Sequence, residues 1–501
     1  MRHLVWISFA LFSAACGDNN SGTDVDAGAD SQTVDAPPAD DMPVDMMTTF
    51  TPPTPYGPPI SPNGPDQVHS VKAVPGGNGW YLAGFAAQTP TGAKNIFVAK
   101  TTATGPDTTF GNVPNAGVAA LAQVTPTGSG DEIDLAVQSD GKILVSFNIT
   151  SETDATDRDV AIVRLTTAGA LDTTFGTAGV ATVNFSDKGS TTILDSARGL
   201  AVDANDNIFV HAVALGAAGT PVNSDFALAK LTADGKLSDG TNGTTGWGQN
   251  DSGKVFINTE IAGTSHNATA RGVVALADGS VIAGGYVGGT GLVPGNVPLY
   301  YKVDASGDLV TGFGGAGTGI FFDAVLTRQT EVYNLALNDA GTHVTTGGYG
   351  NVLGVDRDDW ISMKIDVATG LRDMAWGGST NGAVVVDVSP NMTSSNCRNA
   401  IALPGGKTLL IGSTRGATGN NTPAMDAVFA VLDANGNLDT KYGTGIHRFA
   451  LSSTSDQNDQ FWGAAVSGTK VLVAGWRSTS GAEQSTTLND DSYLIIFDLQ
   501  N

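Results

Sequence analysis

The sequence predicts an all-β fold, a single β-propeller of seven blades with four strands each, which follows a disordered N-terminal tether. Short apolar runs recur along the chain with a period of about 65 residues, and self-similarity at a fixed long period indicates a propeller or a solenoid. Turns rich in Gly and Asp separate the runs. Glycine accounts for 65 of the 501 residues and charged residues for only 15%, a composition that fits many tight turns and disfavours a helical protein.

The first 15 residues are predicted to form a secretory signal peptide. Arg2 precedes the apolar run LVWISFALF, and the small residues 13–15 follow it. The run is too short for a permanent membrane-spanning helix. Small residues directly before Cys16 resemble the lipobox of bacterial lipoproteins, and this resemblance implies that Cys16 is acylated and becomes the first mature residue. The alternative is an ordinary signal peptide beside an incidental cysteine.

Residues 16–65 are predicted to form a disordered linker. The stretch Gly17–Phe50 contains eight Asp and no Lys or Arg, so it cannot bury a core. Prolines between Thr51 and Pro65 stiffen the chain toward an extended spacer. A lipidated cysteine, a charged tether and a folded domain together predict a protein of the cell envelope, lipid-anchored at the outer membrane or cell surface.

Residues 66–501 are expected to fold as one propeller domain of seven repeat units. Each unit begins with a short apolar strand, a Gly/Asp turn and a second strand that ends near a glycine. A third strand with alternating apolar residues follows, and a segment such as LDTTFG (Leu171–Gly176) then leads into a fourth strand. The approximate units are 66–125, 131–187, 195–259, 266–325, 329–390, 396–452 and 459–501.

The last unit stops after its third strand, YLIIFDL. Propellers often close by completing one blade with strands from both ends of the chain, so the segment before Asp66 is predicted to supply the missing fourth strand. Its prolines restrict it to the edge of a sheet, which is where the outermost strand of a blade lies. The alternative is an open or stacked arrangement without this closure.

Three motifs carry a resemblance to a known family: GKILV (Gly141–Val145), the strand ending at Arg164 and Leu165, and LDTTFG. Together they resemble the delta-60 repeat family of bacterial surface and secreted proteins. The resemblance covers Asp66–Asn501 and implies propeller blades of uncharacterised role. It implies no catalytic residue.

One position of the first strand varies between units in a chemically informative way. In a propeller these sites form a ring near one mouth of the central channel. Arginines and aromatic residues there are suited to an anionic or sugar ligand, held by bidentate hydrogen bonds and stacking. The alternative is that each arginine pairs with an Asp of a neighbouring blade. The predicted ring residues are His69, Ile133, Arg198, Arg271, Tyr333, Arg398 and Trp462.

The remaining candidate chemistry is better explained by structure. Asp-rich turns such as Asp304–Asp308 and Asp433–Asp439 contain oxygen ligands that calcium prefers, but Asp and Gly are also the residues that hairpin turns require, and we predict the turn role. Cys397 is predicted to be a small buried hydrophobe. The sequence shows no nucleophile, zinc or phosphate-loop motif, so we predict no catalytic residue, no metal and no cofactor.

The net charge of −24 disfavours nucleic acid and anionic lipid as partners. We therefore predict a monomeric, non-catalytic ligand-binding or adhesion module that contacts the membrane only through its lipid anchor and that binds a glycan or a protein. The alternative is a glycan hydrolase or lyase with its site at one mouth of the channel. The loops Leu237–Asp251 and Gly288–Pro298 are the candidates to supply that site.

Overall fold

The computed structural model describes residues 50–500 with short gaps. The predicted signal peptide, Cys16 and the tether up to residue 49 lie outside the described residues. The gaps are 51–52, 58–59, 62–63, 88–93, 114–116, 122–132, 152–156, 186–194, 216–223, 242, 258–265, 316, 379–380, 390–393, 416–424, 452–457 and 479–489.

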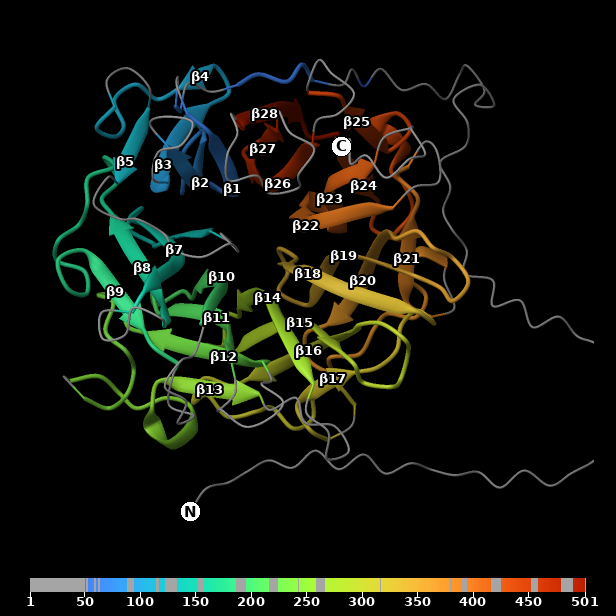
Figure 1. Cartoon of the computed structure of the whole chain (residues 1–501), viewed down its shortest axis with the longest axis horizontal. Coiled ribbons are helices and arrows are strands. Elements are labelled where there is room, and N and C mark those ends of the chain that lie inside the picture. Colours follow the sequence, from blue (N-terminus) through green and yellow to red (C-terminus); the bar gives the residue numbers. More distant parts are fainter. Residues whose placement is uncertain are drawn as a thin grey trace, which may run out of the picture.

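The fold is an all-β propeller, in which sheets are arranged around a central axis (Figure 1). Five blades have four antiparallel strands each. The first two of these blades are β6 (Asp134–Val137), β7 (Ile143–Thr150), β8 (Arg158–Leu165) and β9 (Val180–Val183), and then β10 (Ser196–Val202), β11 (Ile208–Leu215), β12 (Ser224–Leu231) and β13 (Lys254–Ile257). The next two are β14 (Asn267–Ala275), β15 (Val281–Gly288), β16 (Val297–Val303) and β17 (Ile320–Phe322), and then β18 (Gln329–Leu337), β19 (His343–Asn351), β20 (Asp359–Asp366) and β21 (Ala383–Val386). The fifth is β22 (Ser395–Leu403), β23 (Lys407–Arg415), β24 (Met425–Leu432) and β25 (Ile446–Phe449).

The two sheets at the ends of the described chain differ from these five. The first has five strands, and the last has three and is joined to β24 by one parallel pair, Met425 with Asn458. The strands are β1 (Asp66–Ala73), β2 (Trp80–Ala87), β3 (Lys94–Thr102), β4 (Gly105–Pro106) and β5 (Val118–Leu121) in the first, and β26 (Asn458–Ser467), β27 (Lys470–Ser478) and β28 (Asp491–Asp498) in the last.

The prediction of seven blades with four strands each is therefore wrong, because the described residues form five blades with four strands. The predicted fourth strand before Asp66 is reduced to a single bridge, in which Tyr56 and Leu494 exchange two backbone hydrogen bonds of 3.0 and 2.9 Å. Pro53 and Pro55 flank this point and have no N–H to donate, so the pairing does not extend into a ladder.

Side-chain contacts at the same seam hold the two ends of the ring together. The Asp66 carboxylate accepts backbone hydrogen bonds from Ser61 and from Ser492 of β28, at 3.1 and 2.9 Å. Burial raises the pKa of Asp66 to about 7. The Asp66 N–H in turn donates to the Asp490 carbonyl at 2.7 Å. The seam therefore joins the start of β1 to the start of β28.

The LDTTFG segment or its variant joins each of the first five sheets to the next one. Its glycine donates its backbone N–H to a carbonyl in a turn of the following sheet at 2.5–2.9 Å, and the aromatic residue before that glycine is buried. This inter-blade contact occurs in the pairs Gly111–Ala168, Gly176–Asp234, Gly248–Ser306, Gly314–Thr369 and Gly377–Asn435.

Glycine is required in the turn that receives this contact. Gly235 has a φ of +84°, and a Cβ there would lie 2.6 Å from Cε2 of Phe175. The hydrophobic core has the same organisation, since clusters of buried residues span neighbouring sheets; one of them contains Leu144 and Phe175 together with Val210 and Ala229. The LDTTFG segment thus recurs in the sequence because it forms the contact between neighbouring blades.

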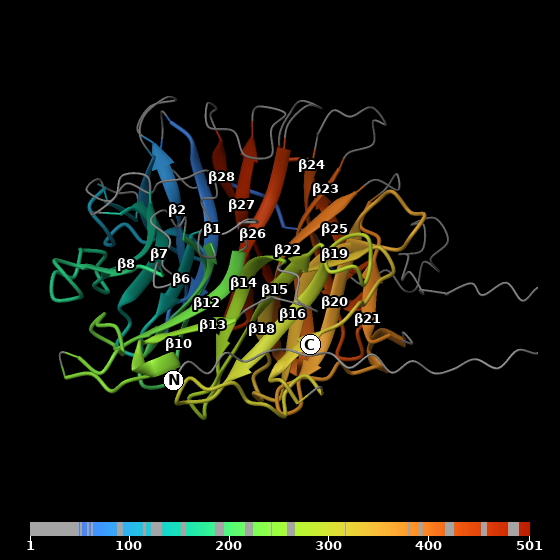
Figure 2. The same cartoon turned by 60° about the horizontal axis from the view of Figure 1, so that its bottom comes forward.

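Among the described residues, helical structure consists of short 3₁₀ turns, η3 (Gln249–Asp251), η4 (Trp376–Gly378), η5 (Pro404–Gly406) and η6 (Thr440–Tyr442). In the part of the chain that the structure describes, no helix is long and apolar enough to cross a membrane. Figure 2 shows the strands of the propeller in an oblique view from the side.

Candidate ligand-binding site in the central cavity

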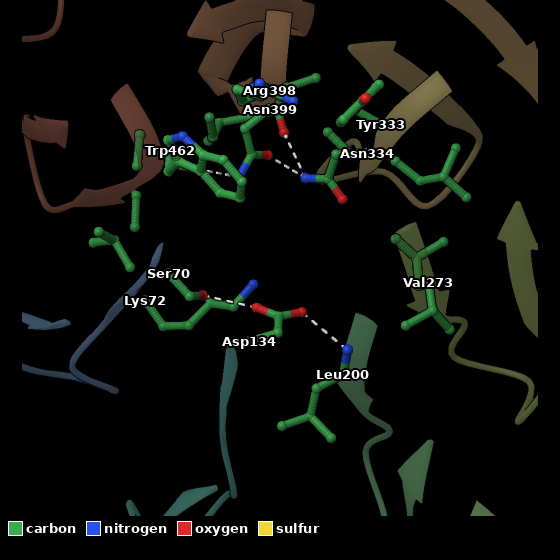
Figure 3. A pocket seen from close by; sticks show the side chains of 18 of the residues that line it. Ser70, Lys72, Asp134, Leu200, Val273, Tyr333, Asn334, Arg398, Asn399 and Trp462 are labelled. Carbon is green, nitrogen blue, oxygen red and sulfur yellow. Dashed lines mark hydrogen bonds between the residues drawn. The ribbon is translucent and has the colours of Figure 1, made fainter. Parts of the chain in front are cut away.

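The first strands of all sheets line one cavity of about 430 Å³ at the centre of the propeller. All of the predicted ring residues are in its wall, and Figure 3 shows part of the site. The ring residues, which we call the channel ring, are His69, Ile133, Arg198, Arg271, Tyr333, Arg398 and Trp462.

β-bulges in the first strands place most of the channel ring. The pairing between first and second strands skips the ring residue in β1, β10, β18, β22 and β26, and in β14 it skips Arg271 together with Gly272. A bulge leaves one residue out of the ladder and re-aims its side chain. The ring residues therefore face the cavity without disturbing the alternation of the remaining strand.

Glycines in the second strands make room for these bulges. A Cβ at any of them would lie only 1.8–2.0 Å from a carbonyl oxygen of the first strand. β11 is an exception, because Ala212 occupies the equivalent place opposite Ala197. The glycine at the end of the second strand is thus a sequence signal for the bulge. These glycines are Gly84, Gly285, Gly348, Gly412 and Gly475.

Five ring residues form a continuous run of cation–π and ring contacts. The Arg271 guanidinium carbon lies 4.0 Å from the ring centroid of Tyr333. Arg398 lies between Tyr333 and Trp462, at 5.2 and 5.0 Å from their centroids. Trp462 then contacts His69 with 5.0 Å between centroids. The wall therefore alternates cationic and aromatic groups around one side of the cavity.

A second set of aromatic residues, on the second strands, contacts the channel ring. These residues were not identified from the sequence. Tyr286 accepts a hydrogen bond of 3.3 Å from Arg271 Nη2, and the hydroxyl groups of Tyr349 and Tyr333 lie 3.1 Å apart. Trp476 stacks on His69 at 5.1 Å. The signal was the aromatic residue directly after the second-strand glycine, as in the repeated GGY of units four and five.

The residues that directly follow the ring residues in the first strands form a polar layer. This layer was not identified from the sequence. The Asn399 side chain donates to the Trp462 carbonyl at 2.9 Å and accepts from Asn334 (Figure 3). The Asp134 carboxylate accepts from the Ser70 hydroxyl at 2.7 Å and from the Leu200 N–H at 2.9 Å. These bonds connect first strands of different sheets. The sequence signal is that the residue after each ring position is small or polar in every unit.

The cavity wall is cationic although the protein is acidic. It contains four basic side chains, Arg198, Arg271, Arg398 and Lys72, but two carboxylates, Asp134 and Asp339. One of these carboxylates is already engaged with Ser70 and Leu200. The predicted ion pairs between ring arginines and neighbouring Asp residues stay a prediction.

Burial keeps the tyrosines beside the ring protonated. It raises the pKa of Tyr286 to about 12, and it also raises the pKa of Tyr349, where Tyr333 and Glu331 act in the same direction. Phenol groups in this state donate hydrogen bonds and do not serve as bases near neutral pH. The site is therefore suited to hold an anion or a hydroxyl group.

The other predicted features have structural roles. Burial raises the pKa of Cys397 to about 12, which suits a small buried hydrophobe and not a reactive thiol. Asp304 accepts backbone N–H groups from Ser306 and Asp308 at 2.8 and 3.1 Å, as the turn role predicts. Among the described residues, no group of three or more His, Cys, Asp or Glu is placed to hold a metal ion.

The two loops expected to build an enzymatic site lie at opposite ends of the sheets. The loop around Gly288–Pro298 joins β15 to β16, at the end where β14 begins. The segment Leu237–Asp251 joins β12 to β13, at the end where β10 finishes, because neighbouring strands are antiparallel. These two loops therefore do not combine into one site.

A comparison with protein-family models agrees with the fold. Residues 138–175 match a family described as a domain of unknown function (DUF5122) beta-propeller, and the chain is a β-propeller repeat protein. No curated protein matches the chain.

Two similar solved structures share little sequence with the chain. One is a polysaccharide lyase of family PL25, an ulvan lyase, with 11% identity, a TM-score of 0.44, and coverage of 88% of this chain and 96% of that one. The other is the β-propeller domain of the trilobed protease from Pyrococcus furiosus, with 8% identity, a TM-score of 0.41, and coverage of 87% and 96%.

Proposed function

We propose that this protein is a non-catalytic binding module that holds an anionic saccharide in its central cavity. The observation that carries the proposal is the continuous run of contacts in the channel ring. Guanidinium groups match carboxylate and sulfate oxygens with paired donors. Aromatic rings beside them offer flat apolar faces against which a sugar ring can pack. The run consists of Arg271, Tyr333, Arg398, Trp462 and His69.

The size and charge of the cavity support this function. A volume of about 430 Å³ falls in the range of small-ligand sites. The cationic wall favours an anion over a neutral ligand, and a low-dielectric surrounding strengthens that preference. Because burial raises the pKa of Tyr286 and Tyr349, their hydroxyl groups stay protonated near neutral pH and can take part in hydrogen bonds around the ligand.

Calorimetry of the purified protein with glucuronate and with glucose tests the proposal. Glucuronate is expected to bind, and its affinity is expected to fall as salt rises, since the interaction is between charges. Glucose is expected to bind at least tenfold more weakly, which corresponds to about 1.4 kcal/mol. Equal affinity for the two sugars, or no binding of glucuronate, would contradict the proposal.

We also propose that Cys16 carries a lipid that anchors the protein in the cell envelope, with the acidic tether holding the propeller away from the membrane. Cys16→Ala is expected to move the protein from the membrane fraction to the soluble fraction, because the anchor is lost. Cys397→Ala is the matched control and is expected to stay with the membranes. Retention of the Cys16→Ala protein in membranes would show that the anchor lies elsewhere.

A further inference from the structure

The structure contains a second cavity, of about 350 Å³, beside the channel ring. It is built where β14 begins and β15 ends, and the β15–β16 loop closes one side. Its volume is again in the range of small-ligand sites. Its wall consists of His266, Asn267, Thr269, Tyr286, Gly288, Gly289 and Asn296.

We infer that this second cavity, which we call the side pocket, binds a neutral sugar unit next to the acidic unit held by the channel ring. The inference rests on the proposed function and adds to it the class of ligand, an oligosaccharide in which acidic and neutral units are neighbours. The argument depends on how the side pocket is built, on its connection to the ring and on its charge.

The side pocket is held in shape by the β15–β16 loop. The Gly295 N–H donates to the Arg328 carbonyl at 2.8 Å, and the Thr330 N–H of β18 donates to the Asn296 carbonyl at 2.8 Å. The Asn296 side-chain amide also donates to Oε1 of buried Glu331 at 2.5 Å. These bonds fix Asn296 between two blades, so its side-chain oxygen has a defined position in the wall.

Tyr286 connects the side pocket with the channel ring. Its side chain lines the side pocket, while its hydroxyl group accepts a hydrogen bond of 3.3 Å from Arg271 of the ring. Its ring centroid lies 6.0 Å from that of Tyr333, another ring residue. One aromatic side chain therefore lies between the two cavities, because it lines the side pocket and contacts two residues of the channel ring.

The chemistry of the side pocket differs from that of the ring. Its wall offers two amides, a hydroxyl, a phenol and an imidazole, and the described residues that line it include no arginine, lysine or carboxylate. Such groups both donate and accept hydrogen bonds, which matches the hydroxyl groups of a neutral sugar. The ring beside it is cationic. The order of the two environments predicts an acidic unit followed by a neutral one.

Binding of three saccharides to the full protein tests the inference: glucuronate, a hyaluronan tetrasaccharide with alternating acidic and neutral units, and tetragalacturonate with an acid on every unit. The hyaluronan tetrasaccharide is expected to bind at least tenfold more tightly than the other two, because it alone places a neutral unit in the side pocket. Thr269→Val and Asn296→Ala are each expected to weaken tetrasaccharide binding about 10-fold and to leave glucuronate binding unchanged.

Thr182→Val is the matched control, since Thr182 is exposed on β9 away from both cavities. If glucuronate binds but the hyaluronan tetrasaccharide binds no better, or if Thr269→Val and Asn296→Ala have no effect on it, the side pocket is not a subsite and the proposed function still stands. Failure of glucuronate itself to bind overturns both proposals. Thr269→Val changes no hydrogen bond described within the protein, so it separates binding from folding even if Asn296→Ala loosens the loop.

Discussion

Replacing Arg398 with Gln is expected to weaken binding of glucuronate about 10- to 100-fold. The Arg398 guanidinium lies between the rings of Tyr333 and Trp462, at the centre of the run of ring contacts. Hydrogen bonds to charged groups contribute about 1.5–3 kcal/mol, and 1.4 kcal/mol corresponds to a factor of ten in affinity. Isothermal titration calorimetry of the two proteins at the same ionic strength measures the difference.

Two variants identify the origin of the effect. Arg398→Lys keeps the charge but loses the planar, paired donors and much of the stacking, so it is expected to restore only part of the affinity. Arg415→Gln removes a cation that is exposed at the end of β23 and does not line the cavity, and it is expected to bind like the parent protein. Equal losses for Arg398→Gln and Arg415→Gln would show that net charge, and not the ring, controls binding.

Alignment of the repeat units was enough to place the channel ring in one cavity, because equivalent positions of equivalent strands lie at the same depth in a propeller. It did not reveal why those positions face the cavity. A bulge is one extra residue in one strand, and only the pairing register exposes it. In units four and five the glycines opposite the bulges are Gly285 and Gly348, and each directly follows another glycine. Both units contain a Gly-Gly pair, so the sequence left open which of the two glycines this is.

The strand count was the weaker part of the prediction. The repeat pattern predicted the four-stranded blades, but not the extra strand β4, which consists of only Gly105 and Pro106. It also predicted a fourth strand where the chain forms only the Tyr56–Leu494 bridge. Both differences concern edge pairing, which depends on local turns and prolines more than on apolar periodicity.

Two hydrogen bonds around the side pocket could not be predicted from the sequence, for another reason. The Tyr286–Arg271 bond connects two adjacent strands of one blade, whereas the Asn296–Glu331 bond connects two blades. The first bond joins two repeated positions, but the alignment does not show which residues at those positions contact each other. The second bond starts from Asn296 in the loop before β16, which has no repeated position, so an alignment of repeats gives no signal for it. What the repeats share explains the fold, and what distinguishes β14–β17 and β18–β21 explains the side pocket.

Replacing Phe175 with Ala is expected to lower the free energy of unfolding by about 3–5 kcal/mol, the usual cost of removing a buried Phe side chain. Phe175 is fully buried at the contact between two blades, below Gly235 of the following one. The Arg164 guanidinium lies 4.7 Å from its ring centroid, so the substitution also removes a cation–π contact. Urea denaturation followed by tryptophan fluorescence measures the loss.

Thr173→Ala provides the control, because Thr173 is exposed in the same LDTTFG segment and its loss is expected to change stability by less than about 0.5 kcal/mol. A loss below about 1 kcal/mol for Phe175→Ala would contradict the role assigned to the buried aromatic side chain of the segment. The reason is that Gly176 would keep its backbone bond to Asp234 in the variant, so a small loss would mean that this bond, and not the aromatic side chain, holds neighbouring blades together.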